Sequence, residues 1–187
     1  MRLLTYSLTL SLDGYVMDSD GGIDWAAPDA EVFRYATDEV REVDVHLLGR
    51  KLYEAMLYWE DPDHTSSFDD AEHEFAALWN RLPKVVFSST LSEVKGNARL
   101  AVGSLVEEIE RLKGEPGDGV IAIGGADLAT QAADLGLIDE YRVRVCPVLI
   151  GGGTPYFPHD GTKTNLELIG MRTFPSQVIA LRYRVKR

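Results

Sequence analysis

The chain has 187 residues, a length that fits one domain with one substantial hydrophobic core. Hydrophobic residues make up 45% and charged residues 26%, which is ordinary for a globular protein and too apolar for a disordered one. The 30 acidic residues outnumber the 19 basic ones, and the net charge of −11 argues against a nucleic-acid binder or a protein that binds anionic membranes.

The first predicted element is a strand over residues 4–12, because apolar side chains alternate with Thr and Ser at period two. The same alternation interrupts the apolar run, so we expect no signal-peptide core in these residues. No stretch approaches the ~18 apolar residues of a membrane span, and we expect a cytoplasmic protein. Asp13-Gly14 ends the strand, and a loop over 18–28 carries Trp25.

Helices and strands alternate after this loop. The Asp-, Ser- and Pro-rich stretch 59–70 predicts a flexible loop, and the helix after Gly125 is expected to turn Leu128, Ala132 and Leu135 inward. The other predicted helices begin near Asp29, pass through Tyr53 and Met56, and cover 71–80 and 104–113. The other predicted strands cover 45–48, 84–87, 98–102, 120–123, 140–149, 165–172 and 177–185.

This alternation predicts a single domain over residues 1–187 with a three-layer α/β/α architecture and a mostly parallel sheet of about eight strands. The last two strands are joined only by Thr173–Ser176, which is too short for a parallel crossover. The sheet should therefore be mixed, with an antiparallel C-terminal edge.

Cysteine and histidine usage gives no sign of a metal site. Cys146 is the single cysteine and lies in an apolar stretch, so we interpret it as a buried hydrophobic residue that forms no intrachain disulfide. The four histidines form no metal-type pair, and no metal is expected.

Three predicted loops follow strands at the edge where ligands of open α/β sheets collect. Gly124-Gly125 either lets the backbone approach a pyrophosphate at a helix start or only makes a tight turn. Gly49-Arg50-Lys51 could pair with a phosphate or make ordinary surface ion pairs, and Ser88-Ser89 could bind a phosphate or cap the next turn.

The order of these motifs along the chain resembles the dihydrofolate reductase-like family. It is closest to the branch with the reductase domain of bacterial riboflavin biosynthesis and its stand-alone relatives. The motifs that carry this resemblance are Ser11–Tyr15, the loop with Trp25, Gly49–Glu54, Val85–Ser89, Ile123–Ala126, Gly136–Glu140 and Pro147–Gly153.

The resemblance implies an eight-stranded mixed sheet that binds NADPH across the strand ends. Gly124 and Gly125, followed by Ala126 and Asp127, would lie against the pyrophosphate. Gly49, Arg50 and Lys51 would contact the adenosine side with its 2′-phosphate, together with Ser88 and Ser89.

On the substrate side, the resemblance makes Asp29 the nearest match to a proton-assisting carboxylate, although an acid at a helix start is also favoured by the helix dipole. Asp13 could orient the substrate or only cap its turn. Trp25 and Gly152 are the other candidates near the substrate. Arg142 and Arg144, which alternate along one strand, could bind an acidic substrate, but they are better interpreted as solvated charges of the sheet face.

The sequence thus predicts an NADPH-dependent reductase that transfers hydride to a C=N or C=O group of a small pteridine-, pyrimidine- or carbonyl-type substrate, as 5-amino-6-(5-phosphoribosylamino)uracil reductases do. A phosphorylated substrate would require a second basic cluster, and none stands out. The alternative is a non-enzymatic nucleotide- or ligand-binding protein on the same fold. A homodimer is a candidate assembly.

Overall fold

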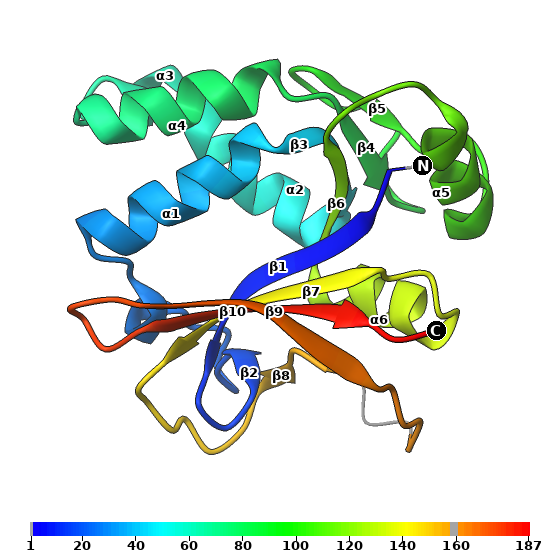
Figure 1. Ribbon diagram of the computed structural model, residues 1–187. Coiled ribbons are helices and arrows are strands. Elements are labelled where there is room, and N and C mark those ends of the chain that lie inside the picture. The colour runs from blue at the N-terminus through cyan, green and yellow to red at the C-terminus, as the bar shows by residue number, and fades with distance from the viewer. Residues whose placement is uncertain (1, 158–160) are drawn as a thin grey trace.

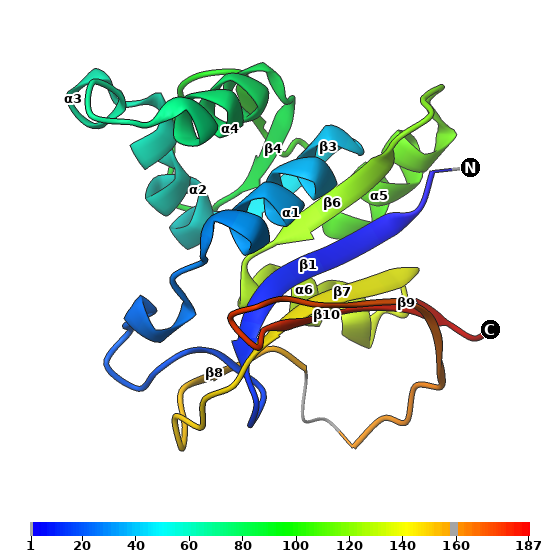
Figure 2. The same ribbon diagram turned by 60° about the vertical axis from the view of Figure 1, so that its left-hand side comes forward.

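The computed structural model describes residues 2–157 and 161–187, so His159 lies outside the described part of the chain. An eight-stranded sheet has the order β5-β4-β3-β6-β1-β7-β10-β9 (Figures 1 and 2). All ladders from β5 to β7 are parallel, and β10 pairs antiparallel with both β7 and β9. The predicted mixed sheet with an antiparallel C-terminal edge is confirmed. Its strands are β1 (Leu4–Ser11), β3 (Val43–Gly49), β4 (Lys84–Phe87), β5 (Ala98–Leu100), β6 (Val120–Gly124), β7 (Glu140–Cys146), β9 (Leu166–Thr173) and β10 (Ile179–Val185).

Helices cover both faces of the sheet. On one face, α5 (Leu105–Gly114) and α6 (Ala126–Asp134) pack on the apolar side chains of β1, β3, β6 and β7 in one large core cluster. On the other face lie α1 (Ala30–Arg41), α2 (Arg50–Met56) and α4 (Asp70–Arg81), with α1 and α4 side by side (Figure 1). Cys146 is buried in a third cluster under α1, as predicted.

Helix boundaries follow local capping chemistry. Asp69 and Ser104 each form a reciprocal capping box at the start of α4 and α5. Leu128 and Ala132 of α6 are buried as predicted, but the inward placement of Leu135 is wrong because α6 ends at Asp134 and 54% of Leu135 is exposed.

The predicted loop over 59–70 is also wrong, because this stretch contains η2 (Leu57–Glu60) and α3 (Pro62–Thr65). Asp61 caps α3, and Pro62 is its first residue. Asp and Pro are common in loops, but both are also favoured at the start of a helix. Trp59 packs its ring on Phe75 at a centroid distance of 4.6 Å, which anchors the segment on α4.

Three short elements were not expected from the sequence. The 3-10 turn η1 (Asp24–Ala26) carries Trp25, and the strands β2 (Tyr15–Met17) and β8 (Thr154–Pro155) form a two-stranded sheet. This pair lies at the bottom of both views, below the main sheet (Figures 1 and 2). Likewise, β7 stops at Cys146 instead of continuing to residue 149, since Pro147 has no amide hydrogen for the ladder.

Candidate functional site

The carboxyl ends of three neighbouring parallel strands bring predicted binding residues together. Gly49 at the end of β3 is opposite Phe87 at the end of β4, and Leu48 is opposite Gly124 at the end of β6. The loops that begin with Ser88, Arg50 and Gly125 therefore leave the sheet side by side. We call this group of strand ends the amide cluster.

Gly124 and Gly125 are glycines for different reasons. A Cβ on Gly124 would lie 2.5 Å from Leu52 Cδ2 and 2.8 Å from His46 Cε1, so packing underneath the loop excludes a side chain. Gly125 has φ +91°, which only glycine adopts at low cost, and its Cβ would be 3.6 Å from Gly49 N, in ordinary contact. The space above Gly125 thus lies between the starts of α2 and α6.

The start of α6 supplies unpaired amides to this space. Gly125 is the N-cap, no side chain among the described residues caps the helix, and the first-turn residues Ala126 and Asp127 follow. First-turn amides have no partner within the helix and carry the positive end of its dipole. The arrangement is suited to a phosphate oxygen approaching Gly125.

His46 lies beneath the cluster but adds no positive charge to it. Its burial, and to a smaller extent the charge of Lys84, lower the pKa of His46 to about 4. The imidazole is therefore neutral at neutral pH. Its ring packs edge-on against Trp79 at 5.5 Å, which identifies it as a packing residue under Gly124.

The polar side chains of the amide cluster differ in whether they already bond to other residues of the protein. Arg50 pairs with Glu54 one turn later at 3.2 Å, and Ser88 Oγ accepts from the Thr90 and Leu91 amides, so both also fill local structural roles. Lys51 and Ser89 are exposed and form no hydrogen bond or ion pair with other described residues through their side chains.

A second group of candidates gathers where β1 and β7 end. The Asp13 carboxylate accepts from Gly151 N at 2.8 Å and Ile150 N at 3.2 Å, and thereby ties the end of β1 to the glycine loop after β7. A hydrogen bond from Ser11, followed by those from Gly151 and Ile150, holds the pKa of Asp13 below its ordinary value. Asp13 is exposed, and its lowered pKa keeps the carboxylate ionised at neutral pH.

The glycine loop is fixed by close packing. A Cβ on Gly153 would lie 2.0 Å from the Met17 carbonyl oxygen, so the loop presses against β2. Gly152, the predicted substrate neighbour, has no atom of the described residues, apart from its chain neighbours, within 4 Å of its Cβ position.

Trp25 and Asp29 lie before α1. Trp25 packs on a buried cluster that includes Cys146 and Val178, and its indole Nε1 is buried with no hydrogen-bond partner in the described chain. Asp29 is the N-cap of α1, where it accepts from the Glu31 and Val32 amides. Hydrogen bonds from the Val32 amide and, to a smaller extent, from the Ser176 side chain lower the pKa of Asp29. This carboxylate is therefore ionised, and its hydrogen bonds cap the helix.

The amide cluster and the β1–β7 group lie apart along the sheet. Tyr6 of β1 is opposite Ile123, whereas Ser11 is opposite Cys146. Tyr6 and Ser11 are five positions apart, which corresponds to roughly 16 Å of strand. A ligand that contacts both groups must be extended.

The interpretation of Arg142 and Arg144 as solvated charges is wrong. Arg142 is 3% exposed and pairs with Glu140 at 2.7 Å and Glu42 at 2.8 Å. Arg144 pairs with Glu39. Helix α1 covers this face of the sheet and supplies Glu39, with Glu42 directly after it, so these arginines are neutralised within the protein.

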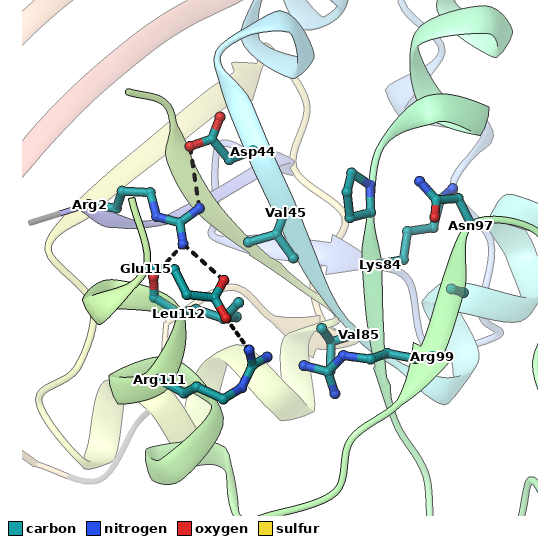
Figure 3. A pocket seen from close by; sticks show the side chains of 12 residues that line it. Arg2, Asp44, Val45, Lys84, Val85, Asn97, Arg99, Arg111, Leu112 and Glu115 are labelled. Carbon is teal, nitrogen blue, oxygen red and sulfur yellow. Dashed lines mark hydrogen bonds and ion pairs between the residues drawn. The ribbon is translucent and has the colours of Figure 1, made fainter. Parts of the chain in front are cut away.

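A cavity of about 330 Å³ lies at the opposite, amino-terminal edge of the sheet (Figure 3). Its cations are already paired: Arg2 with Asp44 at 3.3 Å, and Arg99 and Arg111 with Glu108 at 2.6 and 2.9 Å. The Arg99 hydrogen bond is the largest cause that lowers the pKa of Glu108 to about 2. A ligand phosphate would have to displace these carboxylates, so the amide cluster suits an anion better.

Two further findings concern the described part of the chain. No group of three or more His, Cys, Asp or Glu side chains in residues 2–157 and 161–187 could hold a metal ion. No helix there is long and apolar enough to cross a membrane.

The fold and its strand-end loops define a dihydrofolate reductase-like α/β protein. The family model of the RibD C-terminal domain matches residues 2–180, and the chain belongs to that family. The uncharacterized protein YyaP of Bacillus subtilis (strain 168) is 32% identical over 182 residues, which cover 97% of this chain and 94% of YyaP.

Solved structures share the fold. A putative riboflavin biosynthesis protein from Shewanella sp. PV-4 has a TM-score of 0.79 and 24% identity, with both chains fully covered. A Thermotoga maritima diaminohydroxyphosphoribosylaminopyrimidine deaminase/5-amino-6-(5-phosphoribosylamino)uracil reductase has a TM-score of 0.64 and 16% identity. That match covers 99% of this chain and 57% of the Thermotoga chain.

Proposed function

We propose that this protein is an NADPH-dependent reductase that transfers hydride to a C=N or C=O carbon of a small pteridine-, pyrimidine- or carbonyl-type substrate. The observation that supports the proposal is the amide cluster, where Gly125 at φ +91° opens the space between two helix starts. Membership in the RibD C-terminal domain family supports a reductase-type fold.

The residues of the amide cluster fit a dinucleotide. The pyrophosphate would lie over Gly125 and accept from the first-turn amides of α6. Lys51 and Ser89 have free polar groups for a 2′-phosphate, and Arg50 could exchange Glu54 for it, because an exposed i,i+4 pair contributes little. When bound, NADPH supplies the hydride.

The protein's own contribution would be the placement of cofactor and substrate. Asp13 and Asp29 are ionised and hydrogen-bonded to backbone amides, so neither holds a proton to donate at neutral pH. In this proposal, Asp13 orients the glycine loop beside the substrate, and water supplies the proton. The paired state of Arg142 and Arg144 favours a substrate without a phosphate.

The hydrogen-bonded state of both carboxylates also supports a second candidate, a nucleotide-binding protein without turnover. Loss of nicotinamide absorbance with pteridine, pyrimidine and carbonyl compounds separates the two functions. The panel should include the 5-amino-6-(5-phosphoribosylamino)uracil named for the Thermotoga relative. Binding of NADPH without oxidation by any compound would favour the second candidate.

Titration is expected to show that NADPH binds at least about tenfold more tightly than NADH, because one charge-assisted contact to the 2′-phosphate contributes about 1.5–3 kcal/mol. Lys51→Met should reduce this preference and leave NADH binding unchanged. Lys186→Met, an exposed lysine near the C-terminus, is the matched control. Equal dissociation constants for the two cofactors would contradict the proposed 2′-phosphate site.

A further inference from the structure

Ser11, the last residue of β1, has a completely buried side chain. A buried hydroxyl is costly unless it is hydrogen-bonded. The Tyr15 amide donates to Ser11 Oγ at 3.0 Å, so the serine oxygen is the acceptor in this bond. The hydroxyl hydrogen is therefore left for a second partner.

The second partner is the Asp13 carboxylate. The hydrogen bond from Ser11 is the largest cause that lowers the pKa of Asp13. The same carboxylate accepts from two consecutive amides after β7, Ile150 N at 3.2 Å and Gly151 N at 2.8 Å. Gly151 has φ +77°, and consecutive amides in such a turn form a concave group that binds anions. A series of hydrogen bonds thus connects Tyr15 N, Ser11, Asp13 and the glycine loop.

The glycine loop depends on contacts with other segments because its own residues do little to fix it. Glycine has more backbone freedom than any other residue, and the loop has three in succession, Gly151–Gly153. Packing against Met17 holds the loop at Gly153, and Asp13 holds it at Gly151. Gly152, the candidate substrate neighbour, lies between these two contacts.

Capping of the turn at Gly14 does not account for this geometry. An aspartate that caps its own turn accepts from the amide two residues later, which here belongs to Tyr15. That amide donates to Ser11 instead. The carboxylate of Asp13 accepts from amides that lie 137 and 138 residues later in the chain.

We propose that Ser11 is a positioning residue: its buried hydroxyl orients the Asp13 carboxylate toward the Ile150 and Gly151 amides and thereby fixes the glycine loop beside the substrate. The place of the substrate rests on the proposed function, whereas the hold on the loop does not. Removing the hydroxyl should therefore loosen a loop that follows a different strand.

NMR and hydrogen exchange test the hold on the loop without a substrate. In Ser11→Ala, the pKa of the Asp13 carboxyl group, followed by its ¹³C shift, should rise. Exchange of the Ile150 and Gly151 amides should become roughly tenfold faster. Ser104→Ala is the matched control, because it removes a capping hydroxyl from α5 and should leave the Asp13 pKa and both loop amides unchanged.

A double-mutant cycle tests whether Ser11 acts through Asp13. Asp13 is exposed, so Asp13→Asn should keep the fold, and its neutral side chain is a weaker acceptor for the loop amides. Asp13→Asn alone should speed up the exchange of Ile150 and Gly151. Adding Ser11→Ala to this variant should change their exchange little further, because the two side chains form one hydrogen-bonded unit.

Turnover separates this proposal from the proposed function. With any compound that the protein reduces, Ser11→Ala should lower kcat by roughly tenfold and leave the NADPH dissociation constant unchanged. If the wild-type protein reduces no compound, the proposed function fails, and the exchange of the loop amides still decides whether Ser11 holds the loop. Unchanged exchange at Ile150 and Gly151 in folded Ser11→Ala, additive effects in the cycle, or wild-type kcat would overturn the proposal.

Discussion

Glu140→Gln is expected to lower the free energy of unfolding by about 3 kcal/mol, because it removes the carboxylate of a buried ion-pair network. Glu140 is 1% exposed and accepts from Arg142 Nε at 2.7 Å and Arg182 Nε at 3.0 Å. Arg142 and Arg182 are directly opposite each other on β7 and β10. Without the carboxylate, two like charges face each other across the ladder, and one of them is buried.

Thermal unfolding checks this expectation. For a protein of this size, a loss of about 3 kcal/mol corresponds to a fall in Tm of roughly 6–12 °C. Glu110→Gln on exposed α5 should change the stability by less than about 0.5 kcal/mol. A Glu140→Gln protein as stable as this control would show that Glu39 and Glu42 neutralise Arg142 by themselves.

Gly125→Ala is expected to weaken NADPH binding by roughly a hundredfold or more while the protein still folds. The added Cβ meets only ordinary contacts, the nearest being Gly49 N at 3.6 Å, so it causes no clash within the protein. In the proposed complex, the Cβ would occupy the space through which the pyrophosphate reaches the α6 amides. The positive φ of +91° adds a strain of about 1–3 kcal/mol.

Gly21→Ala is the matched control because Gly21 has a φ of +86° in a loop away from the amide cluster. Both variants should lose similar stability in chemical denaturation, but only Gly125→Ala should lose affinity in an NADPH titration. If folded Gly125→Ala binds NADPH with wild-type affinity, Gly125 serves only to make a tight turn and does not contact the cofactor.

Most of the sheet could be predicted from sequence because its strands carry clear local signals. Alternation over 4–12 and the short connection Thr173–Ser176 were enough to predict β1 and the antiparallel edge. The pair β2–β8 could not be predicted, since strands of three and two residues have no measurable period and depend on a contact between distant segments.

Burial was harder to predict than secondary structure. The alternation of Arg142 and Arg144 identified one face of a strand, but Glu39 and Glu42 lie about 100 residues earlier, and only the docking of α1 brings them there. The segment 57–65 shows a related difficulty. Its Asp and Pro residues are typical of loops, but Asp61 and Pro62 start a short helix here, and Trp59 packs on Phe75 of α4.

The part of the candidate site in which glycines follow strands could be predicted from sequence. The part that depends on contacts between distant segments could not. Gly49 and Gly124 were recognisable from their positions after apolar strands, and the register brings them together. The bond between Asp13 and Gly151 spans 138 residues and exists only because β1 and β7 are neighbours. The roles assigned to Asp13, Asp29, Trp25 and Gly152 stay predictions.

Hydrogen–deuterium exchange of the wild-type protein with and without NADPH tests most directly where the cofactor binds. The first-turn amides of α6, residues 126–128, have no helical partner and should exchange rapidly in the free protein. Bound NADPH is expected to slow exchange there and in the loops at 49–51 and 88–90, and to leave 97–99 and 111–115 at the opposite edge unchanged. Protection at the opposite edge, with none at residues 126–128, would contradict this account.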